Sequence, residues 1–522
     1  MGGGRAFLHR SPDGALTCPL SAQARLAEPE RYVTGRDSGR ETLLIRHSAI
    51  YVVARLLPGA IGLGTTAALT RLLSPETYGA YGLALVIMTF GSTLLFDWLA
   101  VSFLRFYQAR REDERVLGTV IRLFLALMGV SAGAALGCWA TGLVPAGFVS
   151  VAAAGLVLTW ANSWFELVAR FEIADFKPAR YLLMNLGRSG LILAGAVGAA
   201  WLTRSAAWTA FGGAAGMLAG TLLGDVRKWR AAVAFDSGFA RQLLAFGAPL
   251  ACSMAMNSCI FSVSRGLIAL RGSDIELGYY TAAYVMVQST LLSAGGGIAS
   301  AGYSLAVRAV EGGDAAAARA QLAQNGAVLI AALAPIAAGM ALTAPGIARL
   351  VVAPSLAAHV SPIMPWMAAG TFLWCVRSHH LDHAFQLGRA PGLQVRVTGL
   401  AAAISVSLSY VLIPREGAVG VAMALTAAMV VACVHAWHQG KRAYPIPLPV
   451  AAAARAALGC GAMAAVIEVM SSAGCASLAA QVCAGIVTYV AVCLATNTLD
   501  SRLVLRARLA TWRGRGVALD AG

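Results

Sequence analysis

Five charged side chains lie deep inside stretches that otherwise read as membrane-spanning: Arg55, Asp97, Arg188, Arg265 and Arg377. An ionised group at mid-bilayer costs at least ~3 kcal/mol on insertion scales, so such groups usually face a water-filled cavity or an ionic partner. Four of the five are arginines, whose planar guanidinium binds phosphate through paired hydrogen bonds and stays charged. The set predicts a transporter of an anionic cargo. Arg55 and Arg265 are the first substrate-binding candidates, and Arg188 and Arg377 are further ones. The alternative for each is a snorkelling or structurally paired arginine.

Asp97 is a candidate for coupling transport to an ion. It either pairs with Arg55 or Arg188, or binds and releases a proton or Na⁺ during the cycle. Burial and a nearby arginine shift a carboxyl group in opposite directions, so both interpretations stay open.

A second polar group follows Arg377 and adds four coupling candidates: His379, His380, Asp382 and His383. His379 and His383 are four residues apart, on one face of a regular helix. Histidine titrates near neutral pH and can relay protons, whereas the zinc-protease pattern H-E-x-x-H is not present here. The alternative is that these side chains only line a polar cavity. We expect no metal and no cofactor, with H⁺ or Na⁺ as the candidate coupling ion.

The elements that carry these residues are membrane helices. The 522 residues are 58% hydrophobic and 12% charged, with a mean hydropathy of +0.70, whereas a soluble chain carries roughly 25% charged residues. A spanning helix needs ~20 apolar residues, and the apolar runs are continuous rather than alternating. We predict an all-α polytopic membrane protein with fourteen spans: 47–70, 79–104, 117–140, 147–168, 181–203, 207–225, 243–269, 279–305, 324–344, 363–387, 393–413, 418–437, 450–470 and 477–497.

The net charge of +16 is sorted by loop, which argues against nucleic acid as a partner. Loops on the side shared by both termini hold sixteen Lys and Arg, and the opposite loops hold five. The positive-inside rule therefore predicts a multi-pass membrane protein with both termini in the cytoplasm. We interpret the basic tail 1–46 as disordered, and either solvated or in contact with the anionic headgroups of membrane lipids. Residues 498–522 form a second basic tail on the cytoplasmic side.

A repeat divides the chain. Arg71 precedes a short acidic turn and a helix opened by Gly79, and Arg271 precedes a similar turn and Gly278, about 200 residues later. We predict two six-helix lobes, 47–225 and 243–437, related by an axis along the membrane normal, followed by the helix pair 450–497. Glycines at every fourth position from Gly212 predict close packing of the sixth helix.

Several segments resemble a known family in order and spacing. They are 54–59 (ARLLPG), 69–79 (LTRLLSPETYG), 104–107 (LRFY), 278–284 (GYYTAAY) and 412–420 (LIPREGAVG). Together they resemble the oligosaccharide flippases of the polysaccharide-transporter family, within the multidrug/oligosaccharidyl-lipid/polysaccharide exporter superfamily. One departure is Ser264 before Arg265, where the family often has an acidic residue.

The resemblance implies a non-enzymatic flippase of the bacterial inner membrane that moves an undecaprenyl-diphosphate-type lipid-linked oligosaccharide outward for exopolysaccharide or O-antigen synthesis. Its implied partners are a polysaccharide polymerase and chain-length machinery. One alternative is a cation-coupled multidrug exporter (an antiporter), although such cavities more often hold acids. Another is a membrane glycosyltransferase or polymerase. That enzyme would need sizeable external loops, whereas no stretch between helices reaches the ~50 residues of a folded domain.

Overall fold

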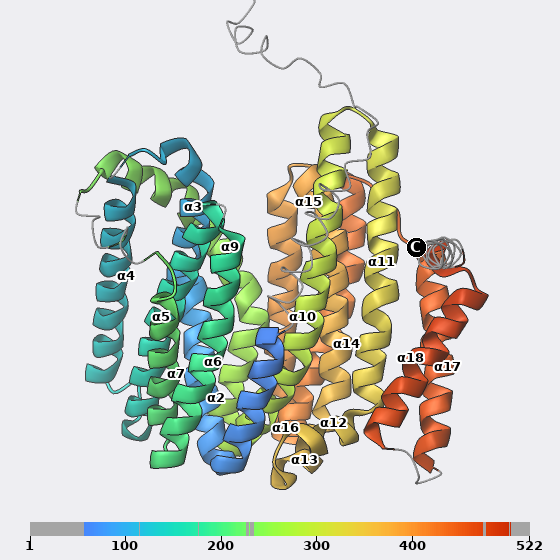
Figure 1. Cartoon of the computed structure of the whole chain (residues 1–522), viewed down its shortest axis with the longest axis horizontal. Helices are drawn as coiled ribbons and strands as arrows, with labels where there is room; N and C mark the ends of the chain where they lie inside the picture. Colours follow the sequence, from blue (N-terminus) through green and yellow to red (C-terminus); the bar gives the residue numbers. More distant parts are fainter. Residues whose placement is uncertain are drawn as a thin grey trace, which may run out of the picture. The chain divides into compact units, whose positions relative to one another are not determined.

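The structure is a computed structural model that describes residues 57–113, 115–175, 177–225, 229, 234–472, 477–500 and 502. The chain divides into two units, Met1–Ala49 and Ile50–Gly522, and every described residue lies in the second. These residues fold into helices and their connections, without a strand among them (Figure 1). The predicted all-α class is confirmed.

The elements from residue 57 to α7 are called the N-lobe. They are the helix over residues 57–72, α2 (Pro75–Gly91), η1 (Ser92–Phe96), α3 (Asp97–Tyr107), η2 (Gln108–Arg110), α4 (Arg115–Ala140), η3 (Ala146–Phe148), α5 (Val149–Ala174), α6 (Pro178–Thr203) and α7 (Ala206–Thr221). α5 packs between α2 and α7, and α6 covers α7. η1 is one π-helical turn that joins α2 and α3, so these three elements together hold the predicted span 79–104.

The contact between α6 and α7 depends on glycine. A Cβ atom added at Gly212 or Gly216 would overlap backbone atoms of α6, and one at Gly220 would lie 3.0 Å from the Cα atom of Arg188. Small residues at this spacing allow two helix backbones to approach closely in a membrane. The close packing predicted from the four-residue glycine spacing is therefore confirmed.

The elements from α9 to α16 are called the C-lobe. They are α9 (Ser237–Arg271), α10 (Asp274–Glu311), α11 (Ala315–Leu342), α12 (Ala344–Val351), α13 (Pro354–Val360), α14 (Ile363–Val376), η4 (Arg377–Leu381), α15 (His383–Leu387) and α16 (Pro391–Ala443). α16 breaks at Gly417, whose φ of 54° suits glycine, and so contains both predicted spans 393–413 and 418–437. The Glu276 carboxylate accepts a hydrogen bond from the Ala418 N–H at 2.7 Å and ties this break to α10.

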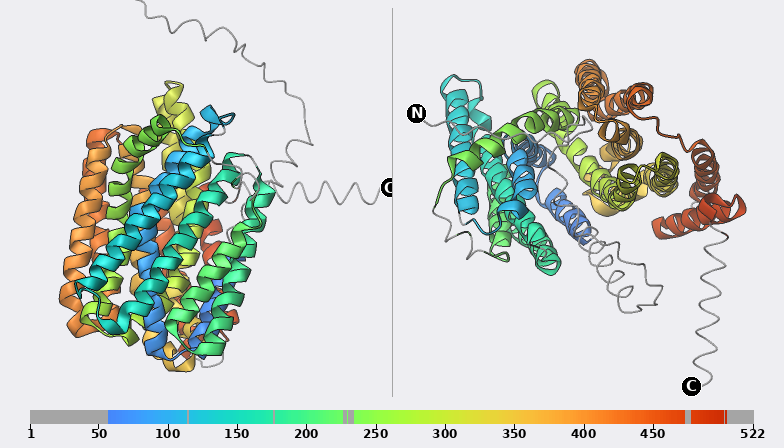
Figure 2. Two further views of the ribbon diagram at one scale, coloured as in Figure 1. Left: turned by 90° about the vertical axis from the view of Figure 1, so that its left-hand side faces the viewer. Right: turned by 90° about the horizontal axis from the view of Figure 1, so that it is seen from above.

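α9 joins the two lobes. Its early part packs on α3, where Phe246 meets Phe106 edge to face at 5.5 Å, and its later part packs on α16 and α10. α10 also crosses α2 of the N-lobe. Seen from above, the blue-to-green helices of the N-lobe and the yellow-to-orange helices of the C-lobe form two neighbouring groups (Figure 2).

A final hairpin consists of α17 (Val450–Ser472) and α18 (Leu478–Ala495), followed by the 3₁₀ turn η5 (Thr498–Asp500). α17 packs on α11. The Tyr489 hydroxyl of α18 donates a 2.7 Å hydrogen bond to the Ala331 carbonyl of α11, which fastens the hairpin to the C-lobe.

Eight helices within the described ranges are long and apolar enough to cross a membrane, judged by length and composition. α16 is one of the eight although it holds two predicted spans, and α7 has only 16 residues. η4 interrupts the helical segment 363–387. The span 47–70 begins outside the described residues. The number fourteen therefore stays a prediction, while the polytopic membrane architecture is clear.

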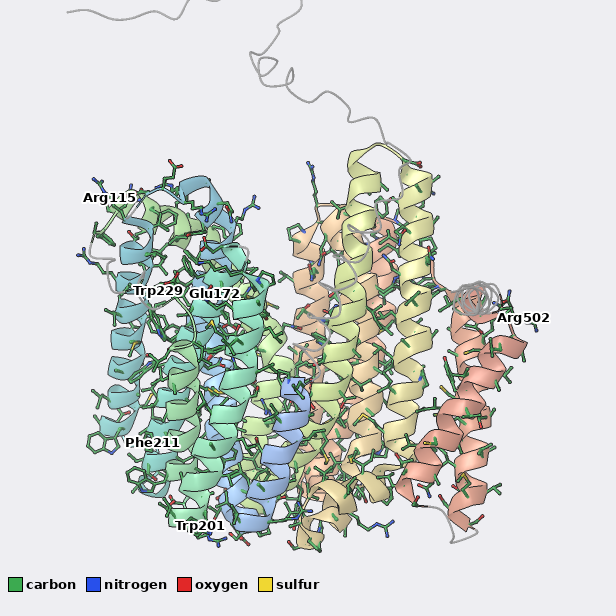
Figure 3. All side chains as sticks on the ribbon, viewed as in Figure 1. Arg115, Glu172, Trp201, Phe211, Trp229 and Arg502 are labelled. Carbon is green, nitrogen blue, oxygen red and sulfur yellow. The ribbon has the colours of Figure 1, made fainter. Side chains whose placement is uncertain are left out.

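Ion pairs gather at the end of the N-lobe that carries the arginine-rich loops, where Figure 3 shows Arg115 and Glu172. Asp175 accepts from Lys177 at 2.6 Å and from Arg111 at 2.9 Å. Asp236 caps α9, and the Phe239 N–H, with that of Gly238 and the Arg110 guanidinium, lowers the pKa of its carboxyl group. These contacts connect the predicted cytoplasmic loops to one another.

Candidate functional site

Arg55, the first substrate-binding candidate, lies outside the described residues. The other candidates form three sites: a polar cluster on η4 and α15, the single residue Arg265 on α9, and a charged group around Arg188 in the N-lobe. Each is described in turn.

The first site is the Arg377 cluster, which we define as Arg377, His379, His380, Asp382 and His383 with their partners Asn257 and Thr398. Arg377 and Asp382 are each 1% exposed, and their Nη2 and Oδ2 atoms lie 3.9 Å apart. Arg377 also donates to Thr398 of α16 and to Asn257 of α9, both at 3.2 Å. The guanidinium therefore holds three helical segments together, and the structural-pair interpretation fits it better than an open anion site.

A π-helical turn creates this pairing. The Asp382 N–H donates to the Arg377 carbonyl at 2.8 Å, five residues back. The extra residue changes the helical phase, so the regular spacing of four assumed for His379 and His383 does not describe this segment. Instead Arg377 and Asp382, five apart, meet. The N-lobe has a matching feature, because the Asp97 N–H closes the π-turn η1 on the Ser92 carbonyl. π-turns inside helices occur frequently at functional sites.

The three histidines occupy different surroundings. His380 is 1% exposed and its ring packs into the notch at Gly326 of α11, where an added Cβ would lie 2.5 Å from Cε1. His379 meets Trp374 edge to face at 5.6 Å, and His383 is 6% exposed. Among the described residues, no group of three His, Cys, Asp or Glu side chains is arranged to hold a metal ion.

Arg265 is the second site and differs from Arg377. It is 2% exposed, its Nε donates to the Phe261 carbonyl at 3.2 Å, and its guanidinium lies 4.0 Å from the Tyr284 ring centroid. Within the described part of the chain its Nη2 has no hydrogen-bond partner, and no carboxylate forms an ion pair with it. A stacked guanidinium can bind an anion through its free edge. Among the described residues, Arg265 is therefore a buried cation that lacks a counterion.

The third site surrounds Arg188. Its Nη1 donates to Glu166 at 3.0 Å, and its guanidinium lies 4.4 Å from the Phe165 ring centroid. Asp97 lies within electrostatic reach of Glu166 and Arg170. Of the two pairings expected for Asp97, the one with Arg188 is replaced by the Glu166 pair, and the one with Arg55 falls outside the described residues.

Sequence reasoning missed two residues of these sites. Glu166 lies inside the predicted span 147–168, so the rule that selected Asp97 also applies to it. Asn257 lies inside the span 243–269 and bridges Arg377 to Trp374, whose Nε1 donates to its side-chain oxygen at 3.4 Å. An amide side chain in an apolar stretch is a weak sequence signal, because many such side chains hydrogen-bond only to the backbone of their own helix.

A family profile described as polysaccharide biosynthesis protein matches residues 68–356 of the chain. No curated protein sequence matches this chain. The matched range includes Asp97, Arg188, Arg265 and Asn257, whereas the segment from Arg377 to His383 lies beyond it.

Solved structures share the fold. The lipid II flippase MurJ in its inward closed conformation is similar with a TM-score of 0.68 and 13% identity, over 86% of this chain and 99% of that one. A multidrug resistance MATE family transporter of the MOP superfamily is similar in its inward-facing form, with a TM-score of 0.56 and 15% identity over 76% and 93%. A multidrug resistance MATE family transporter of the MOP superfamily in an outward-facing conformation is similar with a TM-score of 0.53 and 13% identity, over 76% of this chain and 95% of that one. At these identities the likeness establishes the fold.

Proposed function

Because the chain belongs to the polysaccharide biosynthesis protein family, we propose that it is a flippase for polyprenyl-diphosphate-linked oligosaccharide. It binds the lipid between its two lobes and releases it on the other side of the cytoplasmic membrane by alternating access. The chain is then a carrier rather than an enzyme, and both termini lie in the cytoplasm. A polysaccharide polymerase with its chain-length machinery would use the product.

One observation carries this proposal: the uncompensated guanidinium of Arg265. A buried cation normally requires an ionic partner, and the described residues provide Arg265 with stacking on Tyr284 but no carboxylate. A diphosphate would supply that charge through charge-assisted hydrogen bonds. Because Arg265 is 2% exposed here, binding requires α9 and α10 to separate locally. We propose Arg55 as its counterpart in the N-lobe, with Arg188 and Arg377 as secondary contacts because both already have carboxylate partners.

The experiment is flipping of a polyprenyl-diphosphate-linked sugar in proteoliposomes. Arg265→Gln is expected to slow flipping about thirtyfold, since one charge-assisted interaction contributes about 2 kcal/mol. The matched control is Arg271→Gln, on the same helix, where the arginine is exposed and stacks on Tyr410 at 3.8 Å. Equal rates for Arg265→Gln and wild type would overturn the anion role. Export of cationic drugs without lipid flipping would overturn the proposed substrate.

A separate cavity suits the lipid part of that substrate. It has a volume of 370 Å³ between α11, α12 and the α17–α18 hairpin, and its lining is almost wholly apolar. Its walls include Pro335, Ile336, Met340, Met463, Ile467 and Val490. We propose that it holds a segment of the polyprenyl chain while the diphosphate is bound between the lobes.

Filling this cavity tests the assignment. Gly339 lines it and has open space around its Cβ position, so Gly339→Phe places a ring in the cavity without a backbone clash. Photolabelling by a diazirine-bearing polyprenyl diphosphate should fall about tenfold, the effect of displacing roughly two buried methylene groups at ~0.8 kcal/mol each. Gly461→Phe on α17 also meets open space but does not line the cavity, and should leave labelling unchanged. Equal labelling of both variants would remove the cavity from the lipid path.

A further inference from the structure

The two lobes meet where α2 and α10 cross, close to α12 and α13. We call this end of the bundle the α12–α13 face. A Cβ atom added at Gly79 of α2 would overlap the carbonyl oxygen of Asp274, the first residue of α10. In return, a Cβ atom added at Gly278 of α10 would lie 2.7 Å from the carbonyl oxygen of Pro75, the first residue of α2. Each helix thus has a glycine notch that receives the start of the other.

The contact is reciprocal. Gly79 and Gly278 are 199 positions apart, and so are Pro75 and Asp274. Ser74 and Ser273 are separated by the same 199 positions. The Ser74 hydroxyl accepts a hydrogen bond from the Thr77 N–H at 3.3 Å, and the Ser273 hydroxyl accepts one from the Glu276 N–H at 3.2 Å. Gly82 packs against Thr281, the residue 199 positions later, because a Cβ atom added at Gly82 would lie 3.2 Å from the Thr281 Cβ atom. The two repeat turns predicted from sequence therefore pack against each other around a local two-fold axis.

Arg71 fastens this crossing from the side. Its Nη1 donates to the Val351 carbonyl at 2.8 Å and its Nη2 to the Leu350 carbonyl at 3.2 Å. These carbonyls end α12, where a cation is also favoured by the helix dipole. Next to Arg71, the Thr70 hydroxyl accepts the Ala353 N–H at 3.3 Å. The first helix of the N-lobe is thereby attached to an outer helix of the C-lobe.

A cavity of 170 Å³ lies directly against the crossing. Its walls include Tyr78 and Tyr81 of α2, Thr66 of the helix 57–72 and Val285 of α10, so both lobes contribute. Tyr78 and Tyr81 are the residues that precede the notch positions Gly79 and Gly82. The crossing therefore covers a space between the lobes on the α12–α13 side.

We propose that the α2–α10 crossing with Arg71 is a lock that closes the α12–α13 face and must separate once in every transport cycle. At the glycine notches the two helix backbones pack closely without interlocking side chains, so the helices can separate without rearranging side chains. Arg71 is the releasable latch, because its bonds go to backbone carbonyls rather than to a carboxylate whose pairing would be costly to break. The inference rests on the proposed carrier function, since only a carrier needs this contact to open.

A disulfide across the crossing tests the lock. Gly82→Cys with Thr281→Cys places the two Cβ atoms 3.2 Å apart, close to the roughly 3.5–4.5 Å of a disulfide. The matched control is Gly91→Cys with Thr159→Cys, the same residue types at 3.7 Å between α2 and α5 within one lobe. Both pairs are made in a background whose ten native cysteines have been replaced and whose flipping activity is retained.

Flipping is expected to fall in proportion to the fraction of protein that carries the disulfide between α2 and α10. It should recover on reduction and be unaffected by the control disulfide between α2 and α5. Full activity of the protein linked across the crossing would overturn the lock and make the crossing a fixed pivot.

A second measurement does not depend on the substrate and therefore separates failure of the lock from failure of the proposed function. Spin labels are placed at the exposed positions Glu76 of α2 and Ser355 of α13, and their distance distribution is measured in lipid nanodiscs. Arg71→Ala should raise the population with a longer distance at least about tenfold, because it removes both charge-assisted hydrogen bonds from Arg71 to α12. Arg349→Ala removes a neighbouring arginine whose Nε donates within its own helix to the Pro345 carbonyl, and should change nothing. An unchanged distribution for Arg71→Ala would overturn its role as the latch.

Discussion

Replacing Asp382 by leucine is expected to lower the free energy of unfolding by about 3–5 kcal/mol, because it leaves the Arg377 charge buried without a counterion. Arg377 is 1% exposed, and its remaining partners, Asn257 and Thr398, are neutral. Their hydrogen bonds cannot replace the carboxylate. Thermal or denaturant unfolding of the purified protein in detergent measures the change.

Two variants show whether the pair itself causes this loss. Arg377→Met combined with Asp382→Leu removes both charges and should recover most of the stability, since a buried ion pair replaced by apolar groups is often neutral. Glu166→Leu breaks the Arg188 pair in the N-lobe, whose side chains are 36% and 23% exposed, and should cost only about 1 kcal/mol or less. Equal losses for Asp382→Leu and Glu166→Leu would contradict the assignment of Arg377 as a buried structural partner.

The double variant also tests the proposed coupling site. If Asp382 only holds helices together, the stable Arg377→Met, Asp382→Leu protein should flip lipid with an unchanged response to H⁺ and Na⁺ gradients. If Asp382 exchanges the coupling ion, flipping should continue down the substrate gradient but lose that response. Flipping under opposed ion gradients in proteoliposomes distinguishes these results, and Asp97→Asn applies the same assay to the N-lobe candidate.

The sequence predicted those features that depend on local chemistry. Hydropathy predicted where the helices lie, because each residue has its own free-energy cost of transfer into a bilayer and a run of about 20 apolar residues can span it. The spacing of Gly212, Gly216 and Gly220 predicted close packing, because a four-residue period puts small residues on one helical face. The two repeat turns carried their own signal in Arg71, Arg271 and the glycines that follow.

Features that depend on partner choice did not follow from the sequence. The predicted spans offer Arg188 two acidic residues as partners, Asp97 and Glu166, and only the fold selects Glu166. The π-turns η1 and η4 lie in stretches that read as regular helix, yet η4 changes the faces of the residues around Arg377. Arg265 read like the other buried arginines, whereas the structure distinguishes it by the absence of a carboxylate among its described neighbours. Pairing and helical phase are properties of several segments together, so one segment's composition cannot specify them.

Substituting valine for Gly79 is expected to destabilise the closed α12–α13 face by about 3 kcal/mol, at the upper end of typical overpacking costs. The added side chain clashes with the backbone carbonyl of Asp274 in the first turn of α10. This carbonyl is held by the helix and cannot rotate away as a side chain would. Relief requires the two helices to move apart. Gly64→Val, on the exposed side of the helix 57–72, meets open space and should be neutral or slightly stabilising, because valine has a higher helix propensity than glycine.

The thermal midpoint in detergent and the distance between labels at Glu76 and Ser355 together measure this effect. Gly79→Val should lower the midpoint and lengthen the distance, while Gly64→Val should not lower the midpoint and should leave the distance unchanged. Gly278→Val should act in the same direction but less strongly, because its added Cβ lies 2.7 Å from the Pro75 carbonyl and a small adjustment of the α2 start relieves it. A lower midpoint without a longer distance would mean that the clash disturbs α2 alone. The crossing would then be a packing contact within the fold, and the part of the mechanism that assigns it to opening of the α12–α13 face would be wrong.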